Sequence, residues 1–150
     1  MIEPTTTDPS FLVAIEANRQ LTIAQAGRLA AALAYLLAVA LVAEASSVPL
    51  GVTALAGLVI AALIVRFSRE AREATDRLAA LGFEQGSRRG VDGTAALLVL
   101  LVALLAAVAA WRALQTRAPV VAPVIALLLF AWQWWFYFYS LAQTADPGAP

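Results

Sequence analysis

Residues 29–65 read LAAALAYLLAVALVAEASSVPLGVTALAGLVIAALIV, and this stretch decides the fold. Two apolar runs, 29–43 and 48–65, are separated by a short link that begins at Glu44, and Arg66 ends the second run. Crossing the hydrocarbon core of a bilayer takes about 20 mostly apolar residues in a helix. Because Pro49 suits the first turn of a helix, the stretch predicts two antiparallel transmembrane helices joined by a tight link.

Two further apolar segments follow the same plan. Residues 94–111 read TAALLVLLVALLAAVAAW and end at Arg112, and residues 118–142 contain the aromatic block WQWWFYFY. We expect Pro119 to lie in the first turn of the last helix. The sequence therefore predicts an all-α integral membrane protein, with four transmembrane helices as two helical hairpins and the later spans at 94–115 and 118–143.

The composition supports a lipid environment and excludes several kinds of chemistry. The chain has 150 residues, of which 62% are hydrophobic and 13% charged, against about 45–50% and 25% in soluble domains. All ten basic residues are arginines and are balanced by ten acidic ones, so nucleic acid is not an expected partner. His and Cys are absent and the single Met is Met1, so we expect no haem, zinc, copper or iron–sulfur cofactor.

The arginines also set the expected orientation. Six lie between the two hairpins and two precede the first span, whereas only Arg112 and Arg117 lie on the opposite side. Cytoplasmic loops carry an excess of basic residues. We therefore place both termini in the cytoplasm of a multi-pass cell-membrane protein. The absence of Lys, with abundant Ala, Leu and Val, suggests a GC-rich bacterial genome and hence a bacterial inner membrane.

The first two helices are expected to continue into the cytoplasm. Asp8 and Pro9 form a helix start signal, which predicts one helix over 9–45 and, before Gly82, a second over 49–81. Four i,i+4 ion pairs support the second arm, and its apolar seam contains Phe67, Leu78 and Leu81. The four pairs are Arg66–Glu70, Arg69–Glu73, Arg72–Asp76 and Glu73–Arg77. We expect this seam to be covered in part by the first arm's apolar residues Phe11, Leu12 and Ile15.

Glycine-rich residues 82–93 are predicted to form a loop, with Asp92 capping the third membrane helix. Residues 1–8 and 144–150 are predicted to be flexible ends.

Rows of small residues mark candidate packing faces. Thr53, Gly57 and Ala61 recur every four residues, as do Ala26, Ala30, Ala34 and Ala38. Such rows let helices approach closely in lipid, either within one chain or between subunits. Together with Phe67, Leu78 and Leu81, the residues Thr53, Gly57 and Ala61 are candidate packing or partner contacts.

Three polar residues inside the spans are candidate polar contacts. Arg28 is interpreted as an anchor to lipid phosphate rather than a gate or anion contact. Tyr35 is expected to form a hydrogen bond between helices rather than a ligand or pore contact. Gln133 is expected to be partly hydrated among the aromatic residues rather than to line a polar path.

Aromatic residues mark the two expected membrane interfaces. Trp111 marks one interface, and the other carries Trp132, Trp134, Trp135, Tyr137 and Tyr139. A lipid-interface belt is the favoured interpretation, although a pigment, a quinone or another protein would also suit so many rings.

The sequence carries no catalytic nucleophile, general base or metal-ligand set, so an enzyme is not expected. The favoured function is an accessory or scaffold subunit of a membrane complex, or a homo-oligomer. A channel or pore is the alternative. A small drug transporter is less favoured, because its membrane carboxylate would have to be Glu44 at the end of a helix. Expected partners are the bilayer and other membrane subunits or further copies of the chain.

Overall fold

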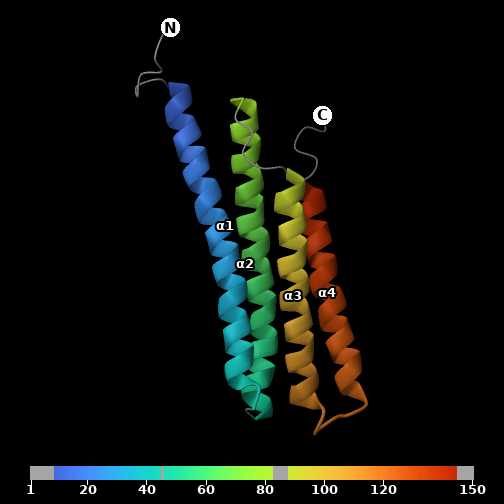
Figure 1. Ribbon diagram of the computed structural model, residues 1–150. Helices are drawn as coiled ribbons and strands as arrows, with labels where there is room; N and C mark the ends of the chain where they lie inside the picture. The colour runs from blue at the N-terminus through green and yellow to red at the C-terminus, as the bar shows by residue number, and fades with distance from the viewer. Residues whose placement is uncertain (1–8, 45, 83–87, 145–150) are drawn as a thin grey trace.

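The computed structural model describes residues 9–44, 46–82 and 88–144, and all of its regular structure there is helical (Figure 1). The four helices are α1 (Pro9–Val42), α2 (Ser47–Ala80), α3 (Arg88–Leu114) and α4 (Val121–Thr144). The predicted cap at Asp8 and the predicted flexible end 1–8 lie outside the described residues. Of the predicted flexible end 144–150, Thr144 is instead the last residue of α4, and 145–150 lie outside the described residues.

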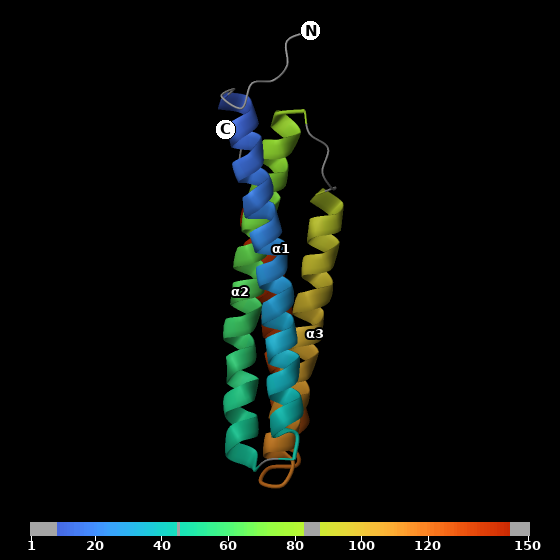
Figure 2. The same ribbon diagram turned by 60° about the vertical axis from the view of Figure 1, so that its left-hand side comes forward.

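The helices are long, roughly antiparallel and unequal in reach. α1 begins and α4 ends at one end of the molecule, which we call the terminal end, and both short links lie at the other, the link end (Figure 1). At the terminal end α1 and α2 extend beyond α3 and α4 and form a two-helix arm (Figures 1 and 2). The described part of the chain therefore consists of a four-helix part and a projecting pair.

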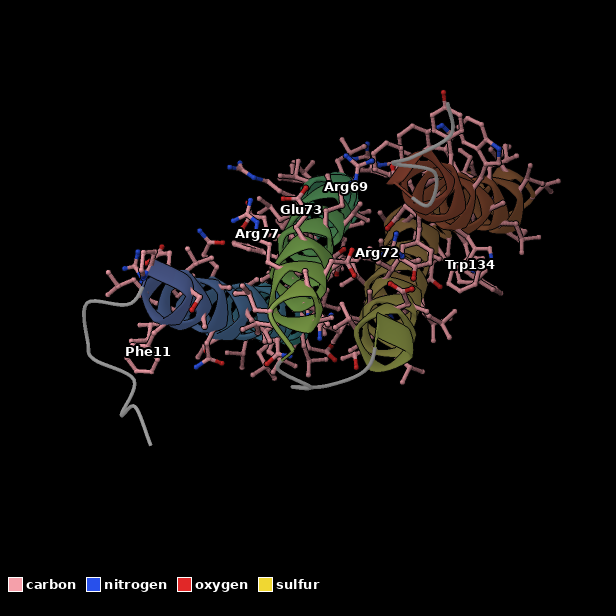
Figure 3. All side chains as sticks on the ribbon, turned by 90° about the horizontal axis from the view of Figure 1, so that it is seen from above. Phe11, Arg69, Arg72, Glu73, Arg77 and Trp134 are labelled. Carbon is pink, nitrogen blue, oxygen red and sulfur yellow. The ribbon has the colours of Figure 1, made fainter. Side chains whose placement is uncertain are left out.

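Seen along the helix axes, α2 lies between α1 and α3, and α4 packs on α3 (Figure 3). The packing of α2 against α3 is as extensive as that of α2 against α1, and α4 also reaches α2. α1 and α4 make no contact with one another in the described residues. The two central helices α2 and α3 thus hold the outer helices together.

The seam between α1 and α2 follows the period of a left-handed coiled coil. Buried residues of α1 recur at spacings of three or four, from Ala14, Ala17, Leu21 and Ala24 to Arg28, Ala32 and Tyr35. This spacing keeps one stripe of a helix facing its partner over many turns. In the arm the stripe packs on Ala71, Ala74 and Leu78 of α2. Because most of these side chains are small, the two backbones approach closely.

Helix α3 starts earlier than predicted. Residues 88–93 are helical rather than part of a loop, and Asp92 lies in the second turn rather than at the cap; the remaining predicted loop residues 83–87 lie outside the described part. Each glycine inside a helix costs roughly 1 kcal/mol, yet this segment contains Gly90 and Gly93. Tertiary contacts offset that cost, because Val91 is buried against the arm and Asp92 pairs with Arg72.

Helix α4 starts later than predicted. It begins at Val121, so Pro119 precedes the helix and Pro123 occupies its first turn. A proline costs no hydrogen bond in the first turn, where the backbone N–H groups have no partner within the helix. The prediction of a proline in the first turn is confirmed, but the residue is Pro123 rather than Pro119.

Three helical segments are long and apolar enough to cross a membrane: Pro9–Val42, Val48–Ala80 and Gly90–Leu114. The apolar segment that is described in α4, Val121–Tyr137, is shorter. Large apolar side chains are exposed on the outside of all four helices, among them Leu37, Leu55, Leu97 and Leu127. An outer surface of this kind is compatible with a membrane protein.

Candidate functional site

Polar side chains gather inside the molecule where α3 and α4 meet the arm. Arg72 of α2 forms an ion pair with Asp92 of α3, with Nη2–Oδ1 and Nε–Oδ1 distances of 2.6 and 3.1 Å. The Arg72 side chain is only 8% exposed, and that of Asp92 is 35% exposed. Arg72 lies between α2 and α3, whereas Arg69 lies on the side of α2 nearer α4 (Figure 3).

Three hydrogen bonds to backbone carbonyls extend this cluster. Arg28 of α1 donates to the Val91 carbonyl at 3.0 Å, and Tyr137 of α4 donates to the Asp92 carbonyl at 3.2 Å. Arg69 of α2 donates to the Ser140 carbonyl of α4 at 2.9 Å. We call Arg28, Arg69, Arg72, Asp92 and Tyr137 the polar clasp, because together they connect all four helices.

The polar clasp centres on the first turns of α3. Three of its hydrogen bonds are accepted by Val91 or Asp92, and their donors lie in α1, α2 and α4. Since α1 and α4 do not touch, they are coupled in this region through α3. The arrangement fixes which turn of each helix lies beside which turn of its neighbours.

The charges of the polar clasp are unequal. The polar clasp contains three guanidinium groups and one carboxylate, which pairs with Arg72. Nε of both Arg28 and Arg69 lacks a partner among the described residues. Burying an unpaired charge is costly, and hydrogen bonds to carbonyl oxygens offset part of that cost. The cluster is thus specific in geometry rather than a strong source of stability.

The sequence analysis missed most of this cluster. Arg28 is only 4% exposed, so the expected anchor to lipid phosphate is wrong: its side chain lies inside the molecule. The i,i+4 rule found the Arg66–Glu70 pair, at 3.4 Å, but not the Arg72–Asp92 pair. The signal was present in the spacing of Ser68, Arg72 and Thr75, which places Arg72 on a buried face of α2.

The remaining predicted arm pairs involve other partners. Arg69 faces α4 rather than Glu73, and Arg77 donates to Oε1 of Gln20 in α1 at 3.1 Å. Glu16 is held within α1 by two hydrogen bonds from Arg19, at 2.8 and 3.1 Å. These bonds lower the pKa of the Glu16 carboxyl, which lies on the exposed surface of the arm.

A second cluster joins three helices in the apolar part. Tyr35 of α1 donates to the Thr53 carbonyl of α2 at 2.9 Å, a hydrogen bond between helices. A Cβ atom at Gly57 would lie 2.7 Å from the Tyr35 hydroxyl and 2.7 Å from Cβ of Ala106 in α3. Glycine at this position lets the Tyr35 phenol of α1 and the Ala106 methyl group of α3 both lie against the backbone of α2. We call Tyr35, Gly57 and Ala106 the glycine contact.

The two rows of small residues have different positions. Thr53, Gly57 and Ala61 are buried inside the chain, so in this structure they pack against its own helices. Ala26, Ala30 and Ala34 are exposed on the outside of α1, and Ala38 is half-buried. Of the two rows, only the one on α1 remains open to another molecule.

The arm seam is covered by different residues from those expected. Leu78 is 2% exposed and packs with Ala14, Ala17 and Leu21, and Leu81 lies at the edge of the same cluster. The ring of Phe67 lies against Gly27, where a Cβ atom would be 2.9 Å from it. The expectation for Phe11, Leu12 and Ile15 is wrong: they are 37%, 53% and 51% exposed, and Phe11 points away from α2 (Figure 3).

The aromatic residues divide into an outward and an inward set. Trp111, Trp132, Trp135 and Tyr139 are each half-exposed or more. The outward rings of α4 stack along the helix, Trp132 on Phe136 and Trp135 on Tyr139. Trp134 is half-buried and stacks on Tyr137, which is 2% exposed and belongs to the polar clasp rather than to a belt.

Gln133 lies on the inward face of α4, one turn from Tyr137. It is 1% exposed, and both ends of its amide lack a hydrogen-bond partner among the described residues. The expectation of a partly hydrated position is therefore wrong. The aromatic neighbours in the sequence suggested an interface, but the periodicity of α4 turns this residue toward the interior.

Within the described residues no group of three or more His, Cys, Asp or Glu side chains lies where it could hold a metal ion. Comparisons with protein-family models, with curated proteins and with solved structures found no match. The function must therefore be argued from the surfaces and contacts of the chain itself.

Proposed function

We propose that this chain is a multi-pass membrane protein without catalytic chemistry, which acts as an accessory or scaffold subunit of a membrane complex. In this proposal all four helices cross the bilayer as two hairpins, and α1 and α2 project into the cytoplasm as the arm. α1 begins and α4 ends at the same end of the molecule, which is compatible with an even number of membrane crossings. Excess arginine at that end favours a cytoplasmic location for both termini.

The observation that carries the proposal is the outward face of α1. Ala26, Ala30 and Ala34 form an exposed small-residue row. Phe11 and Ile15 precede Ala26 by fifteen and eleven residues, which is about four and three helical turns, so they lie on the same side of the helix as the row. The face therefore has small residues inside the proposed span and two exposed apolar side chains, Phe11 and Ile15, toward the start of the proposed cytoplasmic arm.

Both parts of this face are better suited to contact with another protein than to contact with lipid or water. In lipid, small residues favour close packing of helices. In water, exposed Phe and Ile side chains on one stripe favour burial against another surface. A helix that packed along α1 would satisfy both requirements at once, which supports the role of a subunit.

The alternative is a channel or pore made of several copies. The same α1 row favours it, because the row would also pack copies of the chain together. The apolar side chains that flank the row, such as Leu33 and Leu37, would then form a hydrophobic gate. Conductance in a reconstituted bilayer, combined with a homogeneous multiple of the chain mass, would favour this alternative over an accessory subunit.

Affinity purification from the native membrane tests the proposal. Ala30→Leu places a larger side chain on the α1 face, and Ala62→Leu makes the same change at an exposed position of α2. We expect Ala30→Leu to reduce co-purifying protein about tenfold, which corresponds to overpacking by about 1.4 kcal/mol, and Ala62→Leu to have no effect. Equal retention in both variants, or a chain that purifies without detergent, would overturn the proposal.

A further inference from the structure

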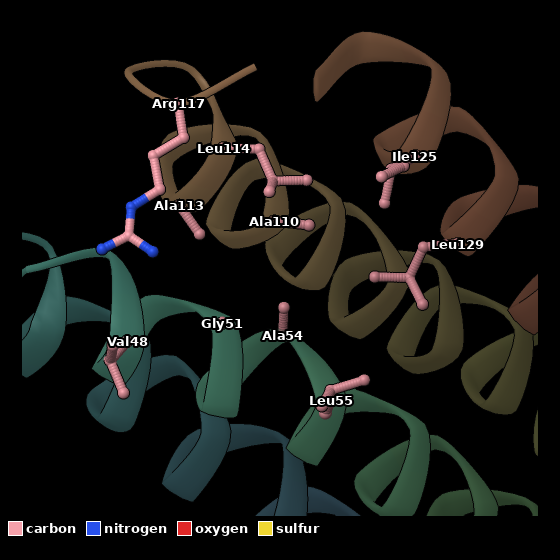
Figure 4. A pocket seen from close by; sticks show the side chains of 10 residues that line it. All are labelled: Val48, Gly51, Ala54, Leu55, Ala110, Ala113, Leu114, Arg117, Ile125 and Leu129. Carbon is pink, nitrogen blue, oxygen red and sulfur yellow. The ribbon is translucent and has the colours of Figure 1, made fainter. Parts of the chain in front are cut away.

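At the link end, α2, α3 and α4 enclose an apolar groove of about 280 Å³ (Figure 4). The residues that line it include Gly51 and Leu55 of α2, Ala113 of α3, and Ile125 and Leu129 of α4. Arg117, in the link between α3 and α4, is the single charged residue among those lining it.

The groove is elongated, as the binding of a linear acyl chain would require. Gly51 and Leu55 lie one turn apart along α2, as do Ile125 and Leu129 along α4, so the groove runs parallel to the helices. The space beside Gly51 is open, because a Cβ atom at that position would meet nothing within 4 Å. If the helices cross a bilayer, the groove has the direction of the surrounding acyl chains.

Charge is placed only at one end of the groove. The guanidinium of Arg117 extends across the mouth toward the start of α2 (Figure 4). The other arginine at this end, Arg112, donates to the Ala43 carbonyl at 3.0 Å and lies with Glu44 in a separate polar pocket. Arg117 is thus the positive group available at the mouth, above an apolar interior.

We propose that this groove binds one acyl chain of an anionic phospholipid, with the lipid phosphate held by Arg117. A phospholipid has the matching order of a charged head followed by an apolar chain, and the groove presents Arg117 at the interface level and apolar side chains toward the membrane interior. The inference rests on the membrane insertion in the proposed function but is independent of any protein partner.

The test uses the full chain in phosphatidylcholine nanodiscs that contain a small fraction of phosphatidylglycerol. The phosphatidylglycerol carries a photoreactive group on its acyl chain, and a phosphatidylcholine with the same group serves as the comparison probe. Mass spectrometry locates the labelled residues. We expect the phosphatidylglycerol probe to label Leu55, Ile125 and Leu129 preferentially over the outward residue Leu37 of α1.

Two variants test the binding of the lipid head group and the binding of the acyl chain separately. Arg117→Gln should lower phosphatidylglycerol labelling in the groove about fivefold, to the level of phosphatidylcholine, since one arginine near the surface contributes about 1 kcal/mol. Gly51→Phe should fill the groove and abolish labelling there by both probes. Gly93→Phe is the matched control, because Gly93 also has open space around it but lies at the terminal end.

Equal labelling of groove and outward residues, or labelling that is insensitive to Arg117→Gln and Gly51→Phe, would overturn the lipid site. Those results would leave the proposed membrane subunit intact, because insertion into the nanodisc is measured separately. A chain that fails to enter nanodiscs at all would overturn both proposals. Circular dichroism of each variant reports whether the helices have been kept.

Discussion

The polar clasp and the glycine contact hold neighbouring helices together in opposite ways. The polar clasp uses long side chains with directional bonds, and it spans all four helices around Val91 and Asp92. The glycine contact uses the absence of a side chain, so that Tyr35 of α1 and Ala106 of α3 both lie against the backbone of α2. Directional bonds select which turns are adjacent, whereas small residues set how closely the backbones approach.

The difference matters because most of the surface is uniform. Ala, Leu and Val side chains on one face of a helix pack almost equally well in several registers. A hydrogen bond or an ion pair in an apolar setting is satisfied in only one of them. The comparison leads to four predictions, given in order of decreasing effect.

Breaking the polar clasp should have the largest effect. Asp92→Ala leaves the Arg72 guanidinium buried without its carboxylate, and we expect a loss of about 3 kcal/mol in the free energy of unfolding. Titration with a denaturing detergent, followed by circular dichroism, measures it. Glu70→Ala is the control, since it removes the exposed Arg66 pair and should cost less than about 0.5 kcal/mol. Equal losses in the two variants would mean that the buried pair has no special role.

Filling the space at the glycine contact should cause the second-largest loss of stability. Gly57→Ala places a methyl group against Tyr35 and Ala106, and we expect it to destabilise the fold by about 2 kcal/mol. Gly51→Ala has open space and should instead stabilise by about 0.5–1 kcal/mol, because alanine is the better helix former. The same detergent titration compares the two variants. A neutral Gly57→Ala would show that the three helices are not close-packed there.

Removing the Tyr35 hydroxyl should have a smaller effect. Tyr35→Phe deletes its hydrogen bond to the Thr53 carbonyl, and bonds of this kind between membrane helices contribute about 0.6 kcal/mol. In the Gly57→Ala background the same change should recover part of the lost stability, because it removes one of the two atoms that would lie 2.7 Å from the new methyl group. Additive losses in the double variant would contradict the close approach of the two side chains.

The exposed ion pair of the arm should have the smallest effect. Hydrogen bonds from Arg19 lower the pKa of Glu16, so the stabilisation they provide is present above the unfolded pKa and is lost as the pH falls through the lower folded value. Arg19→Gln should raise the NMR titration midpoint of Glu16 without a measurable change in the unfolding transition. An unchanged midpoint would show that this pair is absent in solution.

Features of the exterior of the molecule were predicted from the sequence better than contacts in its interior. Apolar runs, prolines and the aromatic block are local features, and they led to four helices with nearly the observed bounds. The errors fall where a distant segment decides the outcome. Residues 88–93 form a helix because the arm packs on Val91 and Arg72 reaches Asp92, contacts that span some twenty residues or more.

The inward side chains show the same limit. Arg28 and Gln133 looked like interface residues because their neighbours in the sequence are polar or aromatic, yet both are almost fully buried. Phe11 and Ile15 looked like core residues because they are apolar, yet the seam uses the alanines beside them. In a chain whose residues are mostly apolar, hydrophobicity no longer distinguishes the two faces of a helix.

The sequence by itself determined that the chain forms long apolar helices, where the links between them lie, and at which end the arginines gather. Tertiary structure alone decided which face of each helix turns inward, that α2 and α3 are central while α1 and α4 make no contact among the described residues, and that the Asp92 carboxylate pairs with the buried Arg72. Helix formation depends on hydrogen bonds between residues four apart, which the local sequence encodes. The choice of facing surfaces depends on contacts between residues far apart in the chain, which similar apolar faces do not specify individually.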